Sequence, residues 1–167
     1  MISVSAVKEL RERTGCGIMD CRRALEEAEG NMERAADLLR QKGLAVAEKK
    51  ASRVASQGVV DAYIHAGGRI GVLVELNCES DFVARTDEFR ALAHDIAMQV
   101  AATSPRYVSP DEVPAELADK KEELALLAQP FIRDPGLTIQ SLITEKIAKF
   151  RENMRVRRFA RYELGGE

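Results

Sequence analysis

The chain has few of the residues from which disulfide frameworks, metal sites and nucleophilic active sites are built. Its 167 residues include three cysteines and two histidines. The cysteines, Cys16, Cys21 and Cys78, are odd in number and form no C-x-x-C pair, which fits a reducing compartment better than a disulfide framework. A zinc site is disfavoured because their spacing matches no common structural site. No motif places a serine or cysteine beside a base, so an enzyme is the least supported class, and we expect no cofactor and no metal.

Long hydrophobic runs and a strong net charge are also missing. No run of 18 or more apolar residues is present, and the charged segment 1–13 predicts an amphipathic helix, not a secretory signal. We therefore expect a cytoplasmic protein with no membrane partner. The net charge is −2, from 25 basic and 27 acidic residues, so bulk electrostatics do not favour nucleic acid as a partner. A hydrophobic content of 46% supports one ordinary domain or two small ones.

Apolar residues at helical spacing predict three short helices in the first fifty residues. The first begins after Ser3, the second covers 18–28 and the third begins at Met32. Gly43 stands where a C-terminal cap of the third helix is expected. The Ala- and Lys-rich segment 44–53 then predicts a separate helix that links this unit to the rest of the chain.

The remaining sequence predicts an α+β domain, with helices packed on one face of a small antiparallel sheet. Gly67 and Gly68 permit the positive φ angles of a tight reversal, so a hairpin is expected between the strands that flank them. Thr86 and Thr138 are expected N-caps. Arg158 breaks the alternation of the last strand, which indicates a bulge or an edge position. The predicted strands cover 57–64, 69–78 and 154–164, and the predicted helices cover 86–102, 114–128 and 139–150.

Four residues, Ser80, Asp81, Phe82 and Val83, lie on the short connection between the second predicted strand and the following helix. A rigid scaffold can hold such side chains toward a partner. Periodicity alone favours the alternative that Phe82 is a core aromatic, because most phenylalanines are buried. Asp81 is either a turn residue or helix cap, or a direct partner contact, and the two roles can coexist. Ser80 is expected to bond to the local backbone, and Val83 to anchor the connection in the core.

Three stretches resemble the signatures of bacterial elongation factor Ts. They are Thr14–Leu25, Asn77–Arg85 and Arg155–Leu164, and together they bracket nearly the whole chain. Ser80 stands where the T-D-F-V core of the second signature usually has threonine, which removes one methyl group and keeps the hydroxyl. Long members of the family carry a second, related core subdomain, and this chain has no room for it.

The resemblance implies a guanine nucleotide exchange factor that acts on elongation factor Tu during translation elongation. It implies a module like the ubiquitin-associated fold (UBA-like) and its linker helix in residues 1–54, and an α+β core with a dimerisation role in 55–167. In the family, the ring at the position of Phe82 enters the GTP-binding domain of elongation factor Tu and displaces helices near the magnesium and phosphate site. Asp81 and Phe82 inherit that role by position.

The resemblance also gives the helical module a contact surface. Lys8 and Arg11, with Ile18 and Met19 in the loop, match positions where the family touches the GTP-binding domain of its partner. A solvated face is the alternative for the two charges, whereas methionine suits an adaptable binding surface. Because only one core subdomain fits, we expect two chains to pair as a homodimer through the last strand or the helix that begins at Pro114.

Two other functions stay open at this stage. In the first, the three-helix module alone binds a peptide or a ubiquitin-like surface, as a UBA-like binding protein without exchange activity. The arginines of the last strand, which include Arg155 and Arg161, offer an RNA-associated protein as the second alternative, although alternating arginines more often guard a solvated edge.

Overall fold

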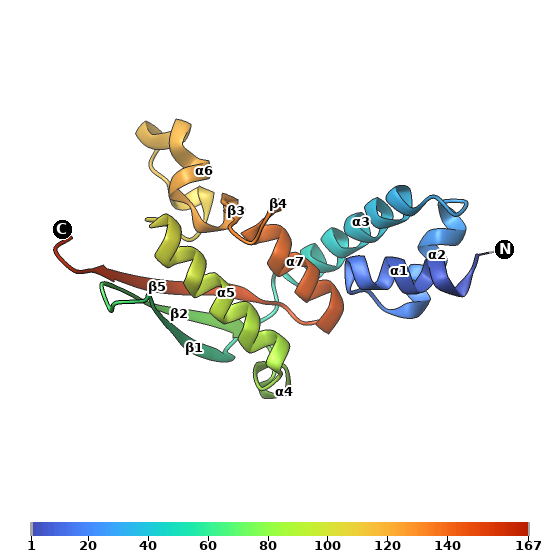
Figure 1. Ribbon diagram of the computed structural model, residues 1–167, viewed down its shortest axis with the longest axis horizontal. Coiled ribbons are helices and arrows are strands. Elements are labelled where there is room, and N and C mark those ends of the chain that lie inside the picture. The colour runs from blue at the N-terminus through green and yellow to red at the C-terminus, as the bar shows by residue number, and fades with distance from the viewer. Residues whose placement is uncertain (1, 167) are drawn as a thin grey trace. The chain divides into compact units, whose positions relative to one another are not determined.

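The computed structural model of the protein describes residues 2–166. The chain divides into two units (Figure 1). The helical unit contains the residues up to Ser52 together with Thr144–Glu152, and the sheet unit contains Arg53–Ile143 and the residues from Asn153 on. The division of the chain into domains at residues 1–54 and 55–167 stays a prediction.

The helical unit is built from α1 (Val4–Thr14), α2 (Ile18–Glu27), α3 (Met32–Lys50) and the second half of α7 (Ile139–Phe150). Side-chain oxygens of Ser3 and Asn31 cap α1 and α3 by accepting from backbone N–H groups three residues on. The helices share a small apolar core. Its buried members are Leu10, Cys21, Ala24, Leu25, Ala28, Ala35 and Leu39.

Gly43 does not end the third helix, so the predicted break at this residue and the separate helix over 44–53 are wrong. Helix α3 continues through Gly43 to Lys50. A Cβ at Gly43 would lie 3.3 Å from the Cβ of Ala148, which is tighter than ordinary contact. The glycine therefore allows a close approach of α3 and α7. In the sequence alone, a glycine needed for such packing looks the same as a glycine that caps a helix.

The sheet unit contains three antiparallel strands in the order β1 (Gln57–Ile64), β2 (Ile70–Cys78) and β5 (Arg155–Glu163). Helix α5 (Asp87–Thr103) follows the one-turn helix α4 (Asp81–Ala84) and covers one face of this sheet (Figure 1). Positive φ angles at Gly67 and Gly68 make the reversal between β1 and β2, as predicted. The residues buried between sheet and helix include Val72, Val74, Leu76, Phe89, Leu92, Ile96 and Val100. The α+β class is confirmed.

Strand β5 is an edge strand and also has a bulge, the two alternatives that its broken alternation predicted. The register against β2 shifts between Glu75 and Leu76, which pair with Arg158 and Val156, so Arg157 is the extra residue. Both arginines point to one carboxylate. Arg158 Nε lies 2.8 Å and Arg157 Nη1 3.3 Å from the oxygens of Glu75.

The segment between α5 and α7 differs from the prediction, because the expected helix over 114–128 does not form as one helix. Backbone groups of residues 114–128 bond to residues that precede this range: Leu124 O accepts from the N–H groups of Arg106 and Tyr107, and Leu126 N donates to Tyr107 O. These bonds use groups that a continuous helix would pair internally. The segment contains 3-10 turns at Pro110–Glu112, Ala115–Lys120 and Leu126–Ala128, helix α6 (Lys121–Leu124), and the ribbon of β3 (Pro130–Phe131) and β4 (Asp134–Thr138).

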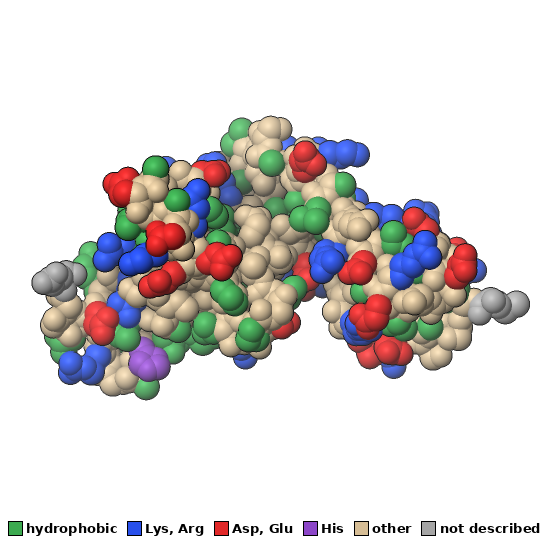
Figure 2. Space-filling view, turned by 90° about the horizontal axis from the view of Figure 1, so that it is seen from above, with side chains coloured by type: hydrophobic (Ala, Val, Ile, Leu, Met, Phe, Trp, Pro, Cys, Tyr) green, Lys and Arg blue, Asp and Glu red, His purple; other side chains and the backbone are tan. Residues whose placement is uncertain are grey.

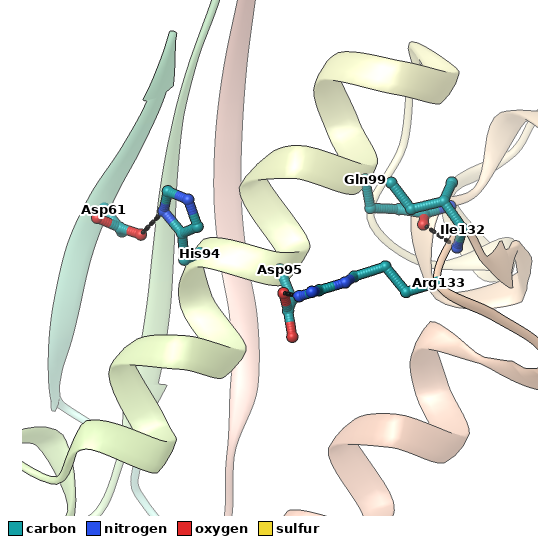
Figure 3. A network of polar contacts seen from close by, with 6 residues as sticks. All are labelled: Asp61, His94, Asp95, Gln99, Ile132 and Arg133. Carbon is teal, nitrogen blue, oxygen red and sulfur yellow. Dashed lines mark hydrogen bonds and ion pairs between the residues drawn. The ribbon is translucent and has the colours of Figure 1, made fainter. Parts of the chain in front are cut away.

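Helix α5 joins the sheet to this segment through side-chain hydrogen bonds on different sides of the helix (Figure 3). Toward β1, His94 Nδ1 lies 3.1 Å from Asp61 Oδ2. Toward the ribbon, the fully buried Gln99 accepts from Ile132 N at 2.9 Å and donates to Pro130 O at 3.0 Å and to Gln129 Oε1 at 3.2 Å. The donors and acceptor of this amide are all used, so it fixes the ribbon on the helix.

The variant Gln99→Leu tests this connection. We expect the free energy of unfolding to fall by about 2–4 kcal/mol, because the buried amide of Gln99 is lost and its three polar partners lose their bonds to it. Urea denaturation followed by circular dichroism measures the change. The same substitution at the exposed Gln41 of α3 is the matched control and should shift stability by less than about 0.5 kcal/mol. Equal effects at the two positions would contradict the role of the buried amide.

The cluster around Glu75 predicts a pH dependence of stability. The hydrogen bond from Arg158 lowers the pKa of the Glu75 carboxyl, with a smaller contribution from Arg157, against the opposing effect of partial burial. Because the pKa is lower in the folded state, the ionised Glu75 stabilises the protein at pH values above the pKa of the unfolded state, about 4.3. This contribution disappears as the pH falls through the lowered pKa.

We therefore expect Glu75→Gln to destabilise the protein at pH 7, with a difference from the parent that shrinks as the pH falls below the usual carboxyl range. Thermal unfolding of both proteins between pH 7 and pH 3 measures it. Glu122→Gln, at an exposed carboxylate in α6, serves as the control for the loss of one charge. A difference between Glu75→Gln and the parent that is the same at all pH values would rule out the ionic contribution.

Candidate functional site

The connection between β2 and α5 is a tightly held turn. Ser80 Oγ accepts from Val83 N at 3.4 Å and caps α4, so the expected bond of Ser80 to the local backbone is confirmed. The thiol of the buried Cys78 donates to Ser80 O at 3.1 Å. Residues 81–84 form one helical turn that was not predicted, although a serine before an acidic residue is a recognisable start signal.

The far end of the turn is fixed by Thr86. Its hydroxyl accepts from Phe89 N at 3.2 Å, which caps α5 as predicted, and donates to Val83 O at 2.8 Å. Phe89 itself is fully buried against the sheet. The turn is therefore bounded by a buried strand end and a buried helix start, and little freedom remains for its backbone.

Phe82 points away from this support and is 82% exposed. The alternative that it seals the hairpin as a core aromatic is wrong. Asp81 is also exposed and lies 3.1 Å from Arg85, one helical turn further along. Val83 is half-buried, so it contributes only part of the anchor that was expected of it. An exposed phenyl ring beside a carboxylate on a rigid turn is suited to binding another protein.

The residues predicted to bind the partner in the helical unit lie around the turn between α1 and α2. Ile18 and Met19 begin α2 and are 54% and 57% exposed. Lys8 and Arg11 are exposed on α1, with Lys8 Nζ 3.8 Å from Glu12. These four residues belong to the helical unit and the Asp81–Phe82 turn belongs to the sheet unit, so each set forms a surface of its own.

The outer face of the sheet is partly apolar, which was not predicted from the sequence. Leu73 faces away from α5 and is 52% exposed. The register places Ile64 opposite Gly71, which is also opposite Tyr162, and both large side chains are exposed on this face. Together with Leu73 they line a shallow groove of about 550 Å³. The available signal was Leu73 itself, an apolar residue at one of the mostly polar positions of β2.

Residues 2–166 contain no group of three or more His, Cys, Asp or Glu side chains placed to hold a metal ion. None of their helices has both the length and the apolar character needed to span a membrane.

Comparisons with known proteins agree with the signatures read from the sequence. Residues 22–126 match the family model described as elongation factor TS. The chain is 54% identical to elongation factor Ts of Carboxydothermus hydrogenoformans, over 99% of this chain and 90% of that protein. It is 51% identical to elongation factor Ts of Heliobacterium modesticaldum and of a Thermoanaerobacter species, over 99% of this chain and 91% and 96% of those proteins.

The similarity runs through both units, and its length shows one difference. Each of these alignments covers 195 positions, which is 28 more than the 167 residues of this chain, so the relatives carry internal residues that have no counterpart here. The match nevertheless covers nearly all of the chain at about half identity. The chain therefore belongs to the elongation factor Ts family, whose members act in the elongation stage of protein biosynthesis.

Proposed function

We propose that the protein is a guanine nucleotide exchange factor that binds elongation factor Tu with GDP bound and promotes GDP release. The observation that carries the proposal is the phenyl ring of Phe82, 82% exposed on a turn that is fixed at both ends. Membership of the family supplies the partner. The protein would act in the cytoplasm, need no cofactor of its own and form or break no covalent bond.

A wedge suits this activity because nucleotide binding depends on tightly defined geometry. A nucleoside diphosphate is held by backbone amides of a phosphate-binding loop at a helix N-terminus and by a magnesium ion. A ring inserted between helices near that site would move these groups. Each tenfold loss of nucleotide affinity needs only about 1.4 kcal/mol, which one well-placed aromatic side chain can supply.

Linkage makes the effect reciprocal. If this protein weakens nucleotide binding by some factor, the nucleotide weakens binding of this protein by the same factor. The rigid turn matters here, because a flexible one would lose part of its binding energy to ordering. Rebinding of GTP would then eject the exchange factor and complete the cycle.

The variant Phe82→Ala tests the wedge. We expect it to reduce the stimulation of GDP release from elongation factor Tu by at least about tenfold, or about 1.4 kcal/mol of transition-state stabilisation, with no loss of fold because the ring is not in the core. Release of fluorescent GDP in stopped flow measures it. Val54→Ala removes apolar surface from another residue that is 81% exposed and should leave release near the parent rate. Unchanged release with Phe82→Ala would refute the wedge mechanism.

The helical unit would provide a second contact with the GTP-binding domain of elongation factor Tu. Exposed Ile18 and Met19 offer apolar area at the start of α2, and the exposed Lys8 and Arg11 add positive charge on α1. Nucleic acid has no role in this proposal. Basic and acidic side chains are mixed over the face shown in Figure 2, where no large patch of positive charge appears.

We further propose that two chains pair through the outer face of the sheet. Exposed Val60, Ile64, Leu73 and Tyr162 lie on the face opposite α5, and Tyr162 comes from the last strand, one of the two seams predicted from the sequence. An uncovered apolar sheet face of this kind is an interaction surface, and a second copy would cover it with an identical face.

The variant Leu73→Glu tests the pairing. A charge at the centre of the face would be buried without a partner in a dimer, so we expect a monomer where the parent is a dimer. Light scattering after gel filtration gives the mass of each. Leu44→Glu, at a residue of α3 that is 53% exposed, is the control and should keep the parent mass. A monomeric parent would eliminate the dimer.

A further inference from the structure

The hydroxyl group of Thr86 connects the turn that carries Phe82 to the first turn of α5. It donates to Val83 O at 2.8 Å and accepts from Phe89 N at 3.2 Å. Val83 O also accepts from the backbone N–H of Thr86 at 3.1 Å. One hydroxyl group therefore joins the exposed turn to a helix start whose Phe89 side chain is fully buried.

Two other side-chain contacts restrain the turn less than Thr86 does. The bond from Val83 N to Ser80 Oγ is 3.4 Å long, which exceeds the usual range for N–H···O bonds. The ion pair between Asp81 and Arg85 is exposed on both sides, and such pairs contribute little to stability. The bond from the Thr86 hydroxyl to Val83 O, by contrast, has the length typical of O–H···O bonds.

We propose that Thr86 is a positioning residue for nucleotide exchange, which holds the ring of Phe82 in the orientation from which it enters the partner. The proposal rests on the exchange function proposed above. Thr86 is half-buried and acts through Phe82, without a contact of its own to the nucleotide site. Without the hydroxyl group the ring would still be exposed, but the backbone that carries it would have to be ordered on binding, at a cost in binding energy.

A positioning role and a merely structural role affect the kinetics of exchange differently. Loss of positioning should lower the rate of GDP release at saturating concentrations of this protein, because the wedge itself is impaired. The helical unit would keep its own contact with the partner, so the concentration that gives half of the maximal stimulation should change little. A merely structural defect leaves fewer folded molecules, which raises that concentration and leaves the limiting rate unchanged.

The variant Thr86→Val tests the role, because valine keeps the β-branched shape and lacks the hydroxyl group. We expect the limiting rate of fluorescent GDP release from elongation factor Tu to fall at least about fivefold, a factor that corresponds to the ordering of about one backbone residue. Thr86→Ser restores the hydroxyl group and should recover most of the parent rate. In the background of Phe82→Ala, Thr86→Val should change the limiting rate less than about twofold, because the effects of two residues that act as a unit do not add.

Hydrogen exchange of the full chain, measured by NMR, tests the order of the turn without the partner. The backbone N–H groups of Arg85 and Thr86 donate to Asp81 O and Val83 O, both at 3.1 Å, so a loosened turn exposes them to exchange. Thr86→Val should speed their exchange at least about fivefold, for the same reason as above. The N–H groups in the centre of β2 should exchange at the parent rate.

The matched control is Thr138→Val. Thr138 is also half-buried, and its hydroxyl group accepts from Ser141 N in the first turn of α7 at 3.1 Å. This variant should lose a similar amount of stability and keep the parent rates of GDP release and of hydrogen exchange in the Phe82 turn.

Three results would each overturn the proposal: a parent limiting rate with Thr86→Val, a rate with Thr86→Ser as low as with Thr86→Val, or an equal loss with Thr138→Val. Unchanged hydrogen exchange at Arg85 and Thr86 in Thr86→Val would overturn it as well. A parent protein that does not accelerate GDP release would overturn the exchange function, and the role of Thr86 with it.

Discussion

The packing of α5 on the inner face of the sheet is the constraint on which the sheet unit depends. Val72, Val74 and Leu76 of β2 and Phe89 of α5 are all at most 2% exposed, and burial of each such side chain contributes about 1.5–3 kcal/mol. Because β2 and α5 are fixed to each other, the few residues between them have little choice of path. The exposed position of Phe82 thus follows from a core in which its own ring takes no part.

Buried side-chain amides fix the positions of the irregular segments, which hydrophobic packing alone does not determine. Gln99 holds the ribbon of β3 and β4 on α5. Asn77 and Asn153 donate to Ala55 O and Arg53 O, which pins the chain where it enters the sheet unit. Apolar contacts tolerate small sliding movements, whereas a hydrogen bond with a defined partner does not. The polar network therefore gives the irregular segments one arrangement where packing would allow several.

The proposed surfaces share one physical property. Each exposes apolar side chains that the rest of its own unit does not cover. The ring of Phe82 and the outer face of the sheet at Leu73 are local departures from a balanced, solvated surface. Such surfaces suit a protein whose proposed work is to compete for binding energy with a nucleotide. They require no reactive group, which agrees with the few histidines and cysteines of the chain.

The sequence by itself determined the features whose causes are local. Gly67 and Gly68 set the hairpin, Thr86 set the start of α5, and the family signature located the turn at Phe82. Tertiary structure decided the rest. Gly43, in the middle of α3, lets α7 approach closely, and backbone groups of Leu124 and Leu126 bond to Arg106 and Tyr107 and not within one helix. The exposure of Phe82 and Leu73 was also decided by the tertiary structure, because no other part of their unit packs over them. A pattern along the chain records which side chains share a face, but only the packed structure decides which faces find a neighbour.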